Sequence, residues 1–306
     1  MTTITAADVK KLRDMTGAGM MDCKNALTET NGDIEAAVDW LRKKGLSKAA
    51  KKSGRIAADG LIGVVAKGLS GAVVEVNSET DFVARNGQFQ DMVRDITSLA
   101  PAANGHLDKL LAATYPGTKE TVGDHVKEMV ATIGENMSVR RTACVTVKDG
   151  VVADYIHNRV ADGLGKIGVL VALESAGDKP ALFETGRMIA MHIAASNPVA
   201  LDLDSVPKDT LEREKAILAE KNAGKKPEML EKIIAGGMKA YAKENCLLEQ
   251  AYIHDTTKTV AQALKESEGQ AGAAIKLTGF VRYALGEGIE KAGDDFADEV
   301  RKLAGG

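Results

Sequence analysis

The hydrophobic positions in the first 45 residues repeat at the spacing of a helix. Thr5 and Asp8 resemble a capping box, and Val9 and Leu12 begin an apolar stripe after them. Residues 20–30 and 34–44 continue the helical pattern and are separated by Asn-Gly. We therefore predict three short helices, the third ending at Gly45, that form a small N-terminal domain.

Beyond residue 58 the pattern changes to short β-branched runs. The runs at residues 61–66 and 72–76 are separated by a Lys-Gly-Leu-Ser-Gly turn and predict two paired strands. An apolar stripe at helical spacing then covers residues 86–99. This order predicts a unit in which a strand pair is followed by a helix.

The same order returns later in the chain. Residues 151–156 and 167–173 predict a second strand pair, and residues 188–195 a helix after it. The segment 71–78 aligns with 168–175, which lies 97 positions downstream. Because the repeat occurs twice and not many times, it indicates a duplicated α+β unit and not a solenoid.

A charged segment over residues 207–244 predicts two helices joined by a Gly/Pro turn at 222–227. Each arm would be about 25 Å long, at 1.5 Å per residue. The apolar stripe is narrow, so we expect the hairpin to project into solvent. Residues 278–285 predict a last strand, and residues 294–303 a closing helix.

These patterns give an α+β fold with five parts. They are a three-helix domain with a basic linker (1–55), a first core subdomain (56–150), a second core subdomain (151–206 and 245–288), a helical hairpin or coiled coil (207–244) and a C-terminal module (289–306).

Composition limits the possible classes of protein. The 306 residues are 44% hydrophobic and carry a formal net charge of −3, a balance that argues against a dedicated nucleic-acid or membrane-surface protein. We expect no membrane span and no targeting signal, which predicts a cytoplasmic protein. The three cysteines lack CxxC spacing and are expected to be free thiols. Residues 42–55 hold seven basic and no acidic residues, and a solvated helix end is favoured there over an RNA contact.

The motifs of common chemistry are missing or misplaced. Residues 163–168 satisfy GxGxxG, but a strand follows them where the dinucleotide fingerprint needs a helix, so we interpret them as a hairpin loop. We find no P-loop, no HExxH or HxxxH spacing and no GxSxG. The expectation is therefore a protein that is not an enzyme and has no cofactor and no metal.

Residues 77–86 form a polar segment that contains one of only five phenylalanines, Phe82. In one interpretation Thr80 or Asp81 caps a helix and Phe82 packs against its own domain. In the other, Phe82 is an exposed aromatic beside an acid and fits a pocket of a partner. Composition alone favours the first.

Two longer motifs resemble a known family. Residues 12–27, LRDMTGAGMMDCKNAL, are similar to the N-terminal signature of bacterial elongation factor Ts, and residues 76–85, VNSETDFVAR, to its second signature. Residues 133–141, 191–196 and 286–291 add shorter matches in the same order. The resemblance implies a ubiquitin-associated-like three-helix domain, a duplicated α+β core, a protruding antiparallel helical hairpin and a C-terminal helix.

The resemblance also implies a function. Members of this family are guanine-nucleotide exchange factors that bind the GDP-bound GTPase elongation factor Tu, disrupt its Mg²⁺/phosphate site and promote GDP release, so that GTP can bind during translation elongation. Such a protein makes no bond, binds no nucleotide of its own, and needs neither direct nucleic-acid contact nor a membrane.

The site residues that the resemblance implies form four groups. Asp81 and Phe82, with Thr80, would enter between two helices of the partner near its Mg²⁺ site, where a rigid aromatic can displace packed side chains. The other contacts are Arg13, Met20, Met21 and Lys24 in the N-terminal domain, Ile133, Gly134, His157 and Ile253 in the core, and Leu303 in the terminal helix.

Two features depart from the family pattern. The loop at 158–166 is longer than expected, which affects the placement of His157, and residues 236–237 are Gly-Gly where Gly-Arg is expected. Two rival functions remain: an enzyme with a site assembled from His157, Glu79 and Asp81, and a ubiquitin-associated-type adaptor that binds through its N-terminal helices without exchange activity.

Overall fold

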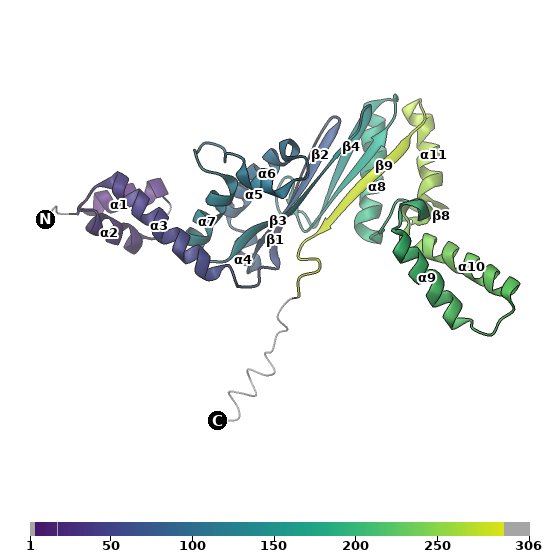
Figure 1. The fold of residues 1–306 in the computed structure, drawn as a ribbon. Coiled ribbons are helices and arrows are strands. Elements are labelled where there is room, and N and C mark those ends of the chain that lie inside the picture. Colours follow the sequence, from purple (N-terminus) through teal and green to yellow (C-terminus); the bar gives the residue numbers. More distant parts are fainter. Residues whose placement is uncertain (1–3, 17, 291–306) are drawn as a thin grey trace.

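The structure is a computed structural model that describes residues 4–16 and 18–290. The molecule is elongated: a three-helix unit lies at one end, a helical hairpin extends at the other, and two β-sheets with their helices lie between them (Figure 1). Among the described residues, no helix has the length and apolar character needed to cross a bilayer.

The N-terminal helices are α1 (Ala6–Thr16), α2 (Met20–Glu29) and α3 (Ile34–Lys52). The predicted capping pair is present, since the Asp8 amide donates to Thr5 Oγ1 at 3.2 Å and the Thr5 amide donates to Asp8 Oδ2 at 3.0 Å. Leu12, Cys23 and Leu27 are fully buried in the core of this unit. These side chains hold the three helices together.

The predicted end of the third helix at Gly45 is wrong, because α3 continues to Lys52. Gly45 is buried in the middle of the helix, and a Cβ atom there would lie 3.1 Å from the Cβ of Ala131. Ala131 belongs to α7 (Val122–Ile133), and α3 packs along that helix. The glycine therefore permits close helix packing and does not end the helix.

The first sheet contains β1 (Asp59–Lys67), β2 (Ser70–Ser78), β3 (Met137–Thr146) and the short β5 (Leu164–Gly165), in the order β3-β2-β1-β5. The strand pair predicted at 61–66 and 72–76 is present as β1 and β2. The predicted helix is α5 (Gly87–Ala103), which buries Phe89, Met92 and Ile96 against the sheet. The sequence patterns did not identify α6 (Leu107–Ala112), α7 or the edge strand β3.

The second sheet contains β4 (Gly150–His157), β6 (Ile167–Glu174) and β9 (Lys276–Ala284), in the order β4-β6-β9. Helix α8 (Lys179–Ser196) packs on β4 and β6 and is longer than predicted. Of the glycines of residues 163–168, Gly163 lies in the connection from β4 to β6, whereas Gly165 is in β5 and Gly168 is in β6, so strands and not a helix follow the GxGxxG pattern. Helix α11 (Val260–Ala271) and the hairpin of β7 (Ala251–Tyr252) and β8 (Asp255–Thr259) complete this part.

The duplicated unit is visible in the topology, because each sheet follows the order strand, strand, helix and later strand, with the second strand central. The aligned glycines Gly71 and Gly168 lie where the sheets meet. A Cβ on Gly71 would reach Leu170 at 2.9 Å, and one on Gly168 would reach Ile62 at 2.6 Å. In each repeat, the absence of a side chain on this glycine leaves room for an apolar side chain of the other repeat.

The hairpin consists of α9 (Lys208–Lys221) and α10 (Pro227–Asn245) and extends away from the sheets (Figure 1). Helix α9 has no buried residue, and α10 buries only Met238 and Ala242, as the narrow stripe predicted. Short 3-10 turns, η1 (Leu203–Ser205) and η2 (Leu247–Glu249), flank it.

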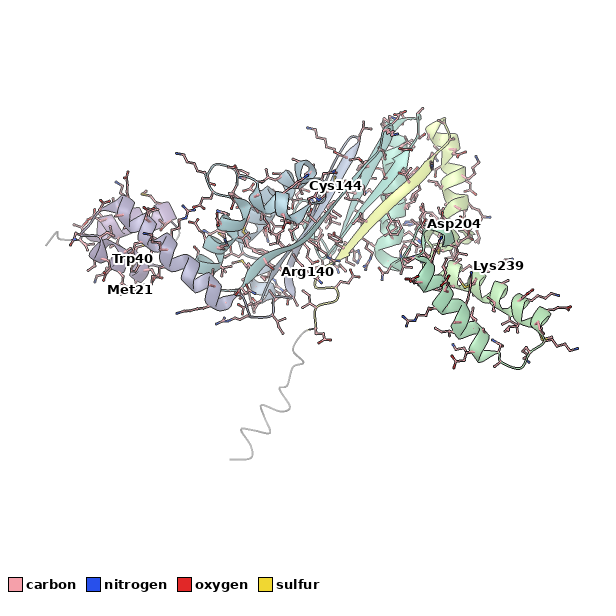
Figure 2. The ribbon with its side chains drawn as sticks, viewed as in Figure 1. Met21, Trp40, Arg140, Cys144, Asp204 and Lys239 are labelled. Atoms are coloured by element: carbon pink, nitrogen blue, oxygen red, sulfur yellow. The ribbon has the colours of Figure 1, made fainter. Side chains whose placement is uncertain are left out.

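The last described residues are tied to the first sheet through the fully buried carboxylate of Glu75. This carboxylate accepts hydrogen bonds from Arg140 and Arg141 on β3 and from the amide of Gly286 at 2.8 Å. Figure 2 shows Arg140 where β3 passes the end of β9. The predicted helix at 294–303, and with it Leu303, lies outside the described residues.

Candidate functional site

Phe82 is the most exposed large hydrophobic side chain of the described residues, with 77% of its surface accessible. It lies on α4 (Asp81–Ala84), a single helical turn that follows β2, with Thr80 as its N-cap residue. The neighbours Val83 and Ala84 are buried and anchor the turn to the first core. The interpretation in which Phe82 packs against its own domain is therefore wrong, and the exposed aromatic is the observed arrangement.

The residues around Phe82, 79–85, form what we call the Phe82 loop. Glu135, which follows the end of α7, holds this loop: its carboxylate accepts from the Thr80 amide at 2.9 Å and from Thr80 Oγ1 at 2.7 Å. The Thr80 side chain makes no capping bond to α4; its hydroxyl donates to Glu135 instead. Ser78 Oγ also donates to the Thr80 carbonyl at 3.0 Å.

A second set of contacts holds the loop to the chain that follows α3. The Glu79 carboxylate accepts from the amide of Asn136 and forms an ion pair with Arg55 at 3.5 Å. Asn136 Nδ2 in turn donates to the Arg55 carbonyl at 2.7 Å. Lys52, at the end of α3, donates to the Gly134 carbonyl. Two distant segments, 52–55 and 134–136, thus meet at the Phe82 loop and fix its backbone.

Asp81, Ile133 and Gly134 lie close to this arrangement. Asp81 pairs with Arg85 one turn later at 2.8 Å, and since both side chains are largely exposed, the pair adds little stability. Ile133 is partly buried at the end of α7, and Gly134 ends that helix with a left-handed φ of 96°. The structure therefore brings together five of the predicted site residues: Thr80, Asp81, Phe82, Ile133 and Gly134.

The predicted residues of the three-helix unit form a separate surface. Met20 and Met21 are 61% and 66% exposed, although methionine is normally a core residue. Arg13 and Lys24 are exposed on the same unit. Figure 2 shows Met21 in the three-helix unit, at the opposite end of the molecule from Lys239 of the hairpin. Flexible apolar side chains of this kind suit a surface that adapts to a partner.

His157 and Ile253 lie in the second half of the core. His157 ends β4, is exposed, and lies 3.1 Å from the Tyr155 hydroxyl through Nδ1. The long loop at 158–166 closes back on it, because the Lys166 amide donates to the His157 carbonyl at 3.1 Å. The loop therefore leaves His157 at the strand end with its ring at the surface.

Ile253 is 40% exposed at the turn between β7 and β8. Its amide donates to Nδ1 of the buried His192 at 3.2 Å, and His192 Nε2 lies 2.9 Å from Gln250 Oε1. Burial lowers the pKa of His192, so the ring is neutral, and Nε2 must carry the proton that is shared with Gln250. This buried histidine positions the turn that presents Ile253.

The residues of the rival enzyme hypothesis have separate partners. Glu79 binds Asn136 and Arg55, Asp81 pairs with Arg85, and His157 contacts Tyr155. No hydrogen bond or ion pair described for residues 4–16 and 18–290 joins His157 to either acid.

Sequence reasoning missed Glu135, Asn136 and Arg55. Glu135 and Asn136 lie inside the motif at 133–141, but nothing in the spacing shows that they contact a loop 55 residues earlier. The only local signal is the polar pair directly after a glycine that ends a helix.

Comparison with known proteins identifies the family of this chain. A family model described as elongation factor TS matches residues 79–287, which include the Phe82 loop, β3 and β5 of the first sheet and the whole second sheet. The chain is 62% identical over 307 residues to elongation factor Ts of Methylobacterium nodulans, with all of both chains covered. It is 58% identical over 308 residues to elongation factor Ts of Parvibaculum lavamentivorans, again with complete coverage of both. By its sequence over its whole length, this chain belongs to the elongation factor Ts family.

Proposed function

We propose that this chain is the guanine-nucleotide exchange factor of elongation factor Tu and acts in the cytoplasm during translation elongation. It would bind the GDP-bound GTPase, disrupt its Mg²⁺/phosphate site and accelerate GDP release, after which GTP binds. Membership of the elongation factor Ts family supports this function. The proposed partner is the GTPase alone, without a nucleotide, cofactor or membrane bound by the factor itself.

The physical requirement for exchange is a difference in affinity. A GTPase holds GDP through backbone amides, a lysine and Mg²⁺. An exchange factor accelerates release only if it binds better to the state in which these contacts are disrupted. Because linkage is reciprocal, GDP must weaken the binding of the factor by the same ratio as the factor weakens GDP.

The observation that carries the proposal is the exposure of Phe82 on a braced loop. A phenyl ring with 77% of its surface accessible costs free energy in water, and Glu135 holds the backbone beneath it. We assign this ring the role of a wedge between two helices of the GTPase. Its preorganised loop means that little conformational entropy is lost on insertion.

The remaining contacts would align the wedge. We assign Met20, Met21, Arg13 and Lys24 to a grip on the GTPase domain. Ile133 and Gly134 would contact the partner from the end of α7, His157 from the end of β4, and Ile253 from the turn between β7 and β8. We further propose that the five parts expected from the sequence act as separate functional units.

The test uses elongation factor Tu loaded with a fluorescent GDP analogue and a stopped-flow measurement of its release. We expect a saturating amount of this chain to raise the release rate by orders of magnitude above the spontaneous rate. Release at the spontaneous rate with binding intact would instead support the adaptor hypothesis. Release at the spontaneous rate without binding would remove elongation factor Tu as the partner.

A further inference from the structure

A histidine and two glutamates converge beside the junction of the three-helix unit and the first sheet unit. One ligand atom from each of Glu120, His125 and Glu128 lies within 4.8 Å of the other two. His125 and Glu128 are three residues apart on α7 and share one face of that helix. Glu120 comes from the loop just before the helix, whose N-cap is Thr121. All three line a cavity of about 620 Å³ between the two units.

The imidazole of His125 is held in a fixed orientation. Its ring stacks on Tyr115 with a centroid separation of 3.6 Å and an interplanar angle of 15°. The Tyr115 hydroxyl is itself anchored by a hydrogen bond of 2.7 Å to Asp95 Oδ2. Oriented in this way, His125 has a buried Nδ1 that contacts no hydrogen-bond partner. Buried polar atoms are rarely left without a partner in folded proteins, so the ring of His125 is available to a ligand.

The two carboxylates are crowded together. One carboxylate oxygen of Glu120 and one of Glu128 lie within 4.8 Å of each other. Arg42 of α3 pairs with Glu120 at 3.1 Å, and no ion pair described for residues 4–16 and 18–290 reaches Glu128. A cation bound between the carboxylates would remove their repulsion.

We propose that Glu120, His125 and Glu128 bind one divalent transition-metal ion, with Zn²⁺ as the best match. One imidazole nitrogen and two carboxylate oxygens are a donor set typical of zinc, whereas Mg²⁺ and Ca²⁺ prefer oxygen ligands alone. Tetrahedral zinc with bonds of about 2.0–2.2 Å needs ligand atoms about 3.4 Å apart, which small rotations of the two glutamate side chains can supply. Water in the cavity would occupy the fourth position.

The sequence motifs considered for a metal site, HxxxH and HExxH, each contain two histidines, and this site has only one. Here the motif is His-x-x-Glu on one helix, and the third ligand comes from the preceding loop. The orientation of the His125 ring is fixed by stacking on Tyr115, whose hydroxyl is hydrogen-bonded to Asp95. The proposal is independent of the exchange function, since binding is measured on this chain alone.

The experiment is a calorimetric titration of the metal-free full-length chain with Zn²⁺, repeated with Co²⁺ and followed by absorption spectroscopy. We expect one equivalent of Zn²⁺ to bind, and an excess of Mg²⁺ not to displace it. His125→Gln and Glu128→Gln should each weaken binding at least tenfold. His106→Gln, which changes an exposed histidine of the same unit, is the matched control and should bind as the unmodified chain does.

Glu128→Gln keeps the stacked imidazole and the side-chain shape, so it remains informative if His125→Gln disturbs the fold. Equal Zn²⁺ affinity in the unmodified chain and in Glu128→Gln would overturn the proposal. A Co²⁺ spectrum with a sulfur charge-transfer band would also overturn it, because the metal would then be bound by Cys23, Cys144 or Cys246.

Discussion

At the scale of single residues, Phe82 is a side chain whose substitution should affect nucleotide exchange strongly and folding stability little. Because it is 77% exposed, Phe82→Ala should change the free energy of unfolding by less than about 0.5 kcal/mol. We expect the same substitution to slow GDP release from elongation factor Tu at least tenfold, measured by stopped-flow at saturating factor. Leu69→Ala is the control, since Leu69 is 46% exposed at the opposite end of the β1–β2 hairpin and should leave release unchanged.

Glu135 should affect the same activity indirectly, by positioning the Phe82 loop. Glu135→Ala removes both hydrogen bonds to Thr80 and should cost about 1–2 kcal/mol of stability. The loosened loop should slow GDP release severalfold while the factor still binds through the three-helix unit. Thr80→Ser keeps a hydroxyl for Glu135 and should behave almost as the unmodified chain. An unchanged rate of GDP release with Glu135→Ala would mean that the hydrogen bonds between Glu135 and Thr80 have no role in exchange.

The residue scale is also where sequence reasoning was least complete. Whether Phe82 packs inward or outward depends on the shape of its surroundings, and composition favoured the wrong answer. The partner of Thr80 is Glu135, and no local pattern marks a contact between residues so far apart in the chain. Residue types can be assigned from sequence, but the partners of polar side chains depend on the tertiary fold.

At the scale of helices and strands, patterns were more informative, and the errors have a common cause. Strands β1, β2, β4 and β6 are rich in β-branched residues and were predicted from them. Strand β3 lies at a sheet edge and carries Arg140 and Arg141, so its pattern is weak. Gly45 was interpreted as a helix end because glycine often has that role, whereas here a neighbouring helix needs the space.

The two adjacent glycines of α10 allow the effect of glycine on helix propensity to be separated from its effect on packing. A Cβ on Gly236 would contact nothing within 4 Å, so Gly236→Ala should stabilise the hairpin by about 1 kcal/mol. A Cβ on Gly237 would lie 2.5 Å from Leu218 Cδ1, and the packing cost of about 1–3 kcal/mol should cancel that gain. Hydrogen exchange of α9 and α10 measures both variants. Equal stabilisation by the two substitutions would contradict this assignment.

At the scale of the whole molecule, Glu75 links the first sheet to the chain that leaves β9. Burial of its carboxylate opposes ionisation, but hydrogen bonds from Gly286, Arg141 and Asn77 outweigh that effect and hold the pKa of Glu75 below its ordinary value. Glu75→Gln should lower the free energy of unfolding by about 2–3 kcal/mol in denaturant titrations. Glu287→Gln, which removes a half-exposed partner of Arg141, is the control and should cost less than about 1 kcal/mol.

The same network predicts a pH dependence. Because the folded-state pKa is lowered, the stabilisation by Glu75 is complete above the ordinary glutamate pKa of about 4.3 and is lost as the pH falls below it. The difference in stability between the unmodified chain and Glu75→Gln should therefore be constant near neutral pH and shrink below about pH 4. A difference that stays constant on acidification would show that Glu75 contributes through its shape and not its charge.

The duplicated architecture could be predicted because it repeats in sequence, with Gly71 and Gly168 at equivalent positions. The way the repeats face each other could not, since it depends on which side chains each glycine admits, Leu170 in one case and Ile62 in the other.

The continuity of α3 has a mechanical consequence. This helix has 19 residues, so at 1.5 Å per residue it is about 28 Å long. Its first turns belong to the unit that exposes Met20 and Met21, and its last residue, Lys52, binds the carbonyl of Gly134, next to Glu135. A displacement of the three-helix unit on binding of a GTPase at Met20 and Met21 would be transmitted along α3 to the base of the Phe82 loop. Binding of the GTPase at the methionines and insertion of Phe82 would then be mechanically coupled through one helix.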